Sequence, residues 1–78
     1  MDGDPAPVLD AAARYRATGR PVQLAEALED AAVLLAARGD RVAAEAALDE
    51  ALSGYDGLGA VHDARRARAR MSRPRGDR

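Results

Sequence analysis

The sequence predicts an all-α protein of four antiparallel helices that form two stacked helical hairpins. Apolar residues recur at helical spacing in four successive segments, and no segment has the alternating pattern of a strand. Glycines separate the segments, which predicts tight turns and antiparallel neighbours. With 78 residues the chain has room for a single domain.

The first helix is expected over residues 6–18. Val8, Ala12 and Tyr15 are spaced as i, i+4 and i+7, so they mark one apolar face. Asp4, followed by a proline, precedes the segment, and this order suits an N-terminal cap and a first helical turn.

The second helix is expected over residues 21–38, after a turn at Gly19, and it is the most apolar of the four. A helix between two neighbours needs apolar residues on more than one face. The apolar residues here fit that position: Leu24, Leu28, Ala31 or Ala32, and Leu35 on one stripe, and Val33 and Leu34 beside it. We expect the acids Glu26, Glu29 and Asp30 to face solvent.

The third helix is expected over residues 41–55. Gly39 ends the preceding helix and Asp40 supplies an N-cap acid. The apolar residues follow the helical template closely: Ala44, Leu48, Ala51, Leu52 and Tyr55. Glycines at positions 54, 57 and 59 predict that the helix breaks in this region.

The fourth helix is expected to begin near Gly59 and to end at Met71. We expect Leu58 and Val61 to anchor its beginning, while arginine occupies the outer faces. Its apolar stripe is Ala60, Ala64, Ala67 and Met71.

The small side chains of the predicted core limit its stability. Alanine dominates, and Phe and Trp are absent. Burying a Leu or Val side chain contributes roughly 1.5–3 kcal/mol, and an alanine methyl contributes far less. We therefore expect a marginally stable domain that needs a neighbour, with little room for a ligand cavity. Residues 1–5 are expected to be a flexible start and residues 72–78 a disordered basic tail.

Composition argues against several classes of site. The chain has no cysteine, so it has no disulfide, thiolate metal site or catalytic thiol. His62 is the only imidazole and has no partner for a zinc site or a catalytic triad, so we expect it at the surface. The acids lie at helical spacing on expected solvent faces, where no cleft raises a carboxyl pKa. We predict no enzyme activity, no cofactor, no metal and no small-molecule substrate.

The chain also lacks the features of a membrane or exported protein. No run approaches the roughly 18 apolar residues of a membrane span. The first residues are acidic, whereas a signal peptide begins with positive charge. We expect a cytoplasmic protein with no membrane partner.

Charge is distributed unevenly along the chain. Residues 1–61 carry five arginines and eleven acids, whereas residues 62–78 carry seven arginines and two acids. Such a division is found at contacts with nucleic acids or acidic partners, but it also fits a solvated helix whose arginine stems cover apolar surface. The candidate basic contact surface is Arg65, Arg66, Arg68 and Arg70.

The second and third helices resemble the tetratricopeptide repeat. The large and small positions of the repeat, and its turn, match these residues: Leu28, Ala32, Leu35, Gly39, Ala44, Leu48, Ala51 and Tyr55. Asp56 stands where the repeat usually has proline. The resemblance implies that these residues mediate packing within and between repeats.

Most of the chain, about residues 8–71, also resembles the tetratricopeptide-like region that precedes the DNA-binding domain of large ATP-dependent LuxR-type transcriptional regulators. The similar stretches are Gly19-Arg20-Pro21, Ala27-Leu28-Glu29-Asp30-Ala31-Ala32, Gly39-Asp40, Leu58-Gly59-Ala60 and Arg65-Arg66-Ala67-Arg68-Ala69-Arg70. The resemblance implies a sensing or scaffolding role inside a regulator. The chain has no lysine, so it lacks the lysine-containing phosphate-binding loop by which an ATPase holds its nucleotide. No helix-turn-helix follows Met71. We therefore expect a fragment or a stand-alone relative of such a regulator.

Two functions therefore compete. The first is a non-catalytic protein–protein interaction or scaffolding module that binds another protein or itself, because fewer than about three repeats leave apolar ends uncovered. The alternative is an accessory nucleic-acid-binding protein that uses the arginine-rich fourth helix and tail. The alternative is the weaker hypothesis, because no aromatic residues are interleaved with the arginines and no base-reading motif is present.

Overall fold

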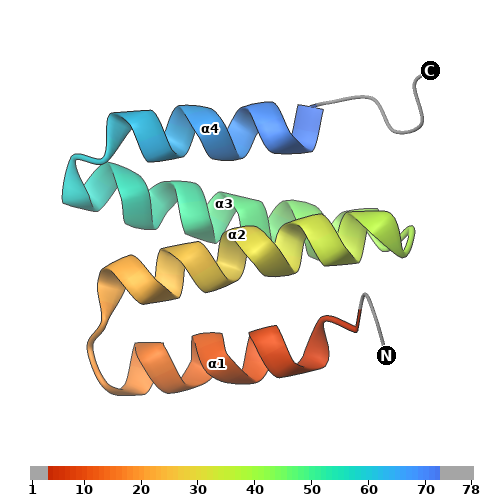
Figure 1. Ribbon diagram of the computed structural model, residues 1–78, viewed down its shortest axis with the longest axis horizontal. Coiled ribbons are helices and arrows are strands. Elements are labelled where there is room, and N and C mark those ends of the chain that lie inside the picture. The colour runs from red at the N-terminus through yellow and green to blue at the C-terminus, as the bar shows by residue number, and fades with distance from the viewer. Residues whose placement is uncertain (1–3, 73–78) are drawn as a thin grey trace.

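The protein is described by a computed structural model over residues 4–72, and this part contains four helices and no strand (Figure 1). The helices are α1 (Ala6–Ala17), α2 (Pro21–Ala37), α3 (Arg41–Leu58) and α4 (Val61–Ser72). Successive helices run in opposite directions, so the chain forms two helical hairpins (Figure 1). The predicted fold class is thus confirmed. The predicted tail lies outside the described residues apart from the end of α4, and the predicted flexible start is described only from Asp4.

The three turns between the helices share one geometry. Each contains a glycine in the left-handed region, which favours glycine because it has no Cβ atom. These glycines recur every 20 residues, at Gly19 (φ +67°), Gly39 (φ +86°) and Gly59 (φ +72°). The amide after each glycine donates to the carbonyl five residues earlier, at 2.9 Å for Arg20, 2.9 Å for Asp40 and 2.8 Å for Ala60. One turn plus one helix is therefore the structural period of the chain.

Two aspartates accept hydrogen bonds from backbone amides at the N-termini of helices. The Asp40 carboxylate accepts a hydrogen bond from the Ala43 amide at 3.3 Å, which confirms its predicted capping role in α3. Asp4 accepts one from the Ala6 amide at 3.0 Å, although the N-cap position of α1 itself is occupied by Pro5.

The third helix is longer than predicted. It continues through Gly54 and Gly57 to Leu58, so the expected break near residue 55 is wrong. Gly54 has a packing reason instead, because a Cβ atom added there would lie 3.3 Å from the Cβ of Ala25 on α2. The missing side chain lets α2 and α3 approach closely.

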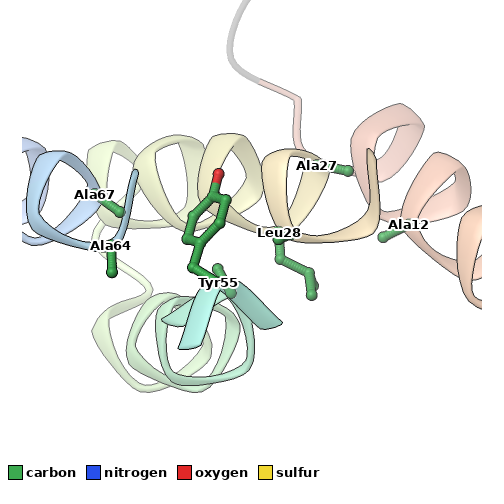
Figure 2. Close-up of a cluster of buried hydrophobic side chains, with 8 residues drawn as sticks. Ala12, Ala27, Leu28, Tyr55, Ala64 and Ala67 are labelled. Carbon is green, nitrogen blue, oxygen red and sulfur yellow. The ribbon is translucent and has the colours of Figure 1, made fainter. Parts of the chain in front are cut away.

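The core is made mainly of alanine. Among the described residues, ten of the thirteen buried apolar side chains are alanine, and the others are Leu28, Leu35 and Tyr55. Figure 2 shows the Tyr55 ring between Leu28 of α2 and the alanines of α4. Leu58 and Val61 are 42% and 59% exposed, so the expectation that they anchor α4 is wrong. They sit at the turn, where no other helix covers them.

The helices form an open stack. Helix α2 lies beside each of the other three, α4 lies beside α2 and α3, and the backbone of α1 comes close to α2 alone. Figure 1 shows α1 and α4 at opposite edges of the row. Each edge helix therefore has a face that no other helix of this chain covers.

Candidate functional site

All four arginines of the predicted basic surface lie on α4, but they do not form one surface. Arg66 and Arg70 are one turn apart and both reach α2, where they pair with acids. Arg65 and Arg68 are exposed and form no ion pair within residues 4–72. The surface is thus divided into a paired half and an unpaired half.

The partner of the paired half is Glu29, which sequence analysis placed in solvent. That prediction is wrong, because the Glu29 residue is only 2% exposed. Its Oε1 accepts hydrogen bonds from the Tyr55 hydroxyl at 2.7 Å and from Arg66 Nη2 at 2.8 Å. Its Oε2 accepts one from Arg70 Nη1. A buried carboxylate is tolerated here because three donors satisfy it.

Two further acids complete the cluster, which we call the Glu29 cluster. Arg66 also pairs with Asp63 one turn earlier on α4, and Arg70 approaches Asp30 at 3.5 Å. The Arg66 guanidinium carbon lies 6.0 Å from the centroid of the Tyr55 ring, which places the cation over the aromatic face. The cluster joins α2, α3 and α4.

The pKa values in the Glu29 cluster follow from this arrangement. Burial alone raises the pKa of Glu29, but hydrogen bonds from Arg66, Tyr55 and Arg70 together with the Arg66 charge outweigh it, and the pKa lies below its usual value. Burial and the neighbouring Glu29 carboxylate raise the pKa of Tyr55. Hydrogen bonds to Glu29 and Asp63 raise the pKa of Arg66. Near neutral pH these shifts keep Glu29 and Arg66 charged and Tyr55 neutral, so the ion pairs and hydrogen bonds of the Glu29 cluster persist at that pH.

A sequence signal for the buried acid exists on α2. Ala25, Ala32 and Val33 stand at i−4, i+3 and i+4 from Glu29, so the acid lies within an apolar strip of the helix. Ala25 and Ala32 are buried and Val33 is half-buried. An acid in such a strip, together with arginines one turn apart on another helix, indicates a cross-helix ion pair.

The residues predicted to mediate repeat packing lie mostly in the core. Leu48 is half-buried and packs against both apolar clusters, and Gly39 lies in the turn between α2 and α3. The buried members are Leu28, Ala32, Leu35, Ala44, Ala51 and Tyr55. All of them pack within this chain, so they hold the stack together and do not form its outer surface.

An open groove of about 330 Å³ runs between α1 and α2. Its apolar residues come from both helices, and two acids, Glu26 and Asp30, contribute from α2. The full lining is Pro7, Val8, Ala11, Tyr15, Gln23, Glu26, Ala27 and Asp30. The groove is thus an acidic and apolar surface on the α1 side of the stack.

Three further features of the described residues concern His62, metal binding and membrane spans. His62 is exposed on α4. In the described part of the chain, no three His, Cys, Asp or Glu residues are grouped so that they could hold a metal ion. No helix between residues 4 and 72 is long and apolar enough to cross a membrane.

Comparisons with known proteins add no relative. No family model matches this chain, and neither a curated protein nor a solved structure is significantly similar to it. The resemblance to tetratricopeptide-like regions of LuxR-type regulators accordingly stays a prediction.

Proposed function

We propose that this chain is a non-catalytic protein–protein interaction or scaffolding module whose edge helices bind another protein or a second copy. The observation that carries the proposal is the open arrangement of the helices. Helix α2 has neighbours on several sides, whereas α1 and α4 lie at opposite edges of the stack. Stacked helical hairpins bury their apolar faces only against further units, so uncovered edges favour association.

Exposed apolar side chains support this proposal. Leu9 on α1 and Val61 on α4 are 39% and 59% exposed, so each edge helix carries an exposed apolar side chain. Single exposed apolar residues are common on protein surfaces. Here they accompany a core of small side chains, so the isolated domain has little stability to spare and gains from burying them against a partner.

A relationship to LuxR-type regulators is the more specific form of the proposal. Its support is the residue pattern over the predicted helices and turns. One feature departs from the tetratricopeptide pattern, because the 20-residue period makes a hairpin of 40 residues, longer than the roughly 34 of that repeat. A role as a sensing or scaffolding segment of a regulator therefore rests on that residue pattern alone.

Sedimentation equilibrium at two protein concentrations tests the interaction function. We expect the average mass to rise with concentration while circular dichroism shows the same helical content. A cooperatively folded protein that stays monomeric at both concentrations contradicts the proposal in its self-associating form.

The alternative, binding to nucleic acids, is favoured by one observation. Arg65 and Arg68 are exposed and form no ion pair in the part of the chain that the structure describes. The other two arginines are already paired with acids of the Glu29 cluster, which reduces the positive charge on α4. Titration with duplex DNA at several salt concentrations tests it, and no binding at low salt excludes it.

A further inference from the structure

The groove between α1 and α2 has the chemistry of a surface that binds a positively charged, partly apolar helix. Val8, Tyr15 and Ala27 supply apolar contacts, and Glu26 and Asp30 supply negative charge. Glu26 is exposed and forms no ion pair within residues 4–72. Asp30 is 59% exposed in its side chain, and its ion pair with Arg70 spans 3.5 Å. Both carboxylates can therefore accept another cation.

The complementary surface lies on α4 of the same protein. Val61, Arg65 and Arg68 are spaced as i, i+4 and i+7, so they follow one side of the helix. Val61 is 59% exposed, and both arginines are exposed and unpaired among the described residues. We call these three residues the α4 strip. It combines an apolar contact with two cations, as the groove combines apolar contacts with two anions.

The groove and the α4 strip cannot meet within one chain. The groove lies between α1 and α2, and the backbone of α4 approaches α2 and α3 but not α1. Arg66 and Arg70 occupy the side of α4 that faces α2, so the strip points in another direction. A second copy of the chain carries an α4 strip whose two positive charges match the two negative charges of the groove.

We propose that the α4 strip of one copy docks into the α1–α2 groove of a second copy. This inference deepens the proposed function, on which it rests, by naming the partner and both contact surfaces. Because the groove borders α1 and the strip lies on α4, at the opposite edge of the stack, one contact uses one groove and one strip. The contact is then head-to-tail and leaves one free groove and one free strip on every dimer. Assemblies therefore grow with concentration, and salt weakens them because exposed charges form part of the contact.

Two variants test the proposal, because each removes one surface and leaves the other. Glu26→Arg disables the groove, and Arg65→Glu combined with Arg68→Glu disables the strip. We expect each variant alone to self-associate at least about tenfold more weakly than the wild type. An equimolar mixture should restore association through one intact pair of surfaces. That mixture should stop at a complex of two chains, whereas the wild type continues to larger species.

Two charge variants on α3 serve as controls. Glu45→Arg and Arg41→Glu change exposed charges on α3, outside both surfaces, and should associate like the wild type.

If the wild type associates and neither groove nor strip variant weakens it, or if mixing restores nothing, the head-to-tail contact is wrong and the interaction function stands. If the wild type is monomeric at low salt and high concentration, the head-to-tail contact and the self-associating form of the proposed function both fail. Circular dichroism of every variant confirms that it is folded.

Discussion

The carboxylate of Glu29 on α2 accepts a 2.7 Å hydrogen bond from the hydroxyl of Tyr55 on α3, and both residues are buried. With Arg66 and Arg70 of α4 bound to the same carboxylate, one side chain holds three helices in register. In a core made mostly of alanine, where apolar burial is limited, we expect such a polar contact to help fix how the three helices pack against one another.

Replacing Tyr55 with phenylalanine isolates the contribution of the hydroxyl. The Tyr55→Phe variant keeps the buried ring but removes one of the donors to Glu29. We expect the free energy of unfolding to fall by about 0.5–1.5 kcal/mol in urea denaturation. Tyr15→Phe is the matched control, because the Tyr15 hydroxyl forms no hydrogen bond within the described residues. A loss as large in the control would show that the Glu29 contact contributes nothing specific.

Replacing Glu29 with glutamine removes the charge and keeps the shape. We expect Glu29→Gln to lower the free energy of unfolding at neutral pH by about 1.5–3 kcal/mol, because hydrogen bonds to a charged group become neutral ones. Glu26→Gln on the exposed side of the same helix should change it by less than about 0.5 kcal/mol.

The pH dependence of the same variant gives an independent test. The folded state lowers the pKa of Glu29 below its ordinary value of 4.5. Stability from this carboxylate is therefore fully present above pH 4.5 and is lost as the pH falls through the lower, folded-state pKa. The gap in unfolding free energy between wild type and Glu29→Gln should narrow as the pH is lowered from neutrality toward about 3. A gap that does not change with pH would contradict the assigned ionisation.

Arginines on the two sides of α4 should differ in their effect on stability. Arg66→Gln removes ion pairs with Glu29 and Asp63, whereas Arg65→Gln removes none that the structure describes. Because the Arg66 side chain is 49% exposed, we expect a loss of no more than about 1 kcal/mol for Arg66→Gln and no measurable loss for Arg65→Gln. In double-mutant cycles with Glu29→Gln, Arg66→Gln should show a coupling energy and Arg65→Gln should show none. Equal effects of the two arginine variants would contradict the assignment of Arg66 to the Glu29 cluster.

The parts of the fold that depend on residues close together in the sequence were predictable from it. The left-handed turn at Gly39 and the Asp40 cap form from residues a few positions apart, and both were expected. The burial of Glu29 was missed because its partner Arg66 lies 37 residues further along the chain. When the position of α4 is unknown, nothing distinguishes Glu29 from an acid that faces solvent. Gly54 was misjudged for the same reason, because its role depends on Ala25 of α2.

The candidate site was predictable only in part. The arginine-rich nature of α4 was evident from the sequence. The predicted apolar stripe correctly placed Ala64 and Ala67 on the inward face of α4. Which arginines are paired depends also on which helix lies beside that face, and the sequence did not show that α2 lies on the side of Arg66 and Arg70.

The glycines of α3 provide a test of close helix packing. Gly57 has no atom within 4 Å of an added Cβ, so Gly57→Ala should stabilise the protein by roughly 0.5–1 kcal/mol through helix propensity. Gly54→Ala should gain less, because its Cβ would lie 3.3 Å from that of Ala25. Gly59→Ala should destabilise by about 1 kcal/mol, since its φ is +72°. Thermal unfolding of the three variants should rank them in this order, and equal gains at 54 and 57 would contradict the close contact.

The alanine core itself predicts that larger side chains are not tolerated inside the stack. Ala44 on α3 is fully buried among alanines and leucines of α2 and α3, whereas Ala46 on the same helix is exposed. Ala44→Leu adds methylene groups where neighbouring backbones are too close to admit them, so we expect a loss of about 1–3 kcal/mol in the free energy of unfolding. Ala46→Leu makes the same chemical change in solvent and should stay within about 0.5 kcal/mol of the wild type. If Ala44→Leu is as stable as Ala46→Leu, the interface between α2 and α3 is looser than the structure shows, and close alanine packing is not what sets the helix spacing.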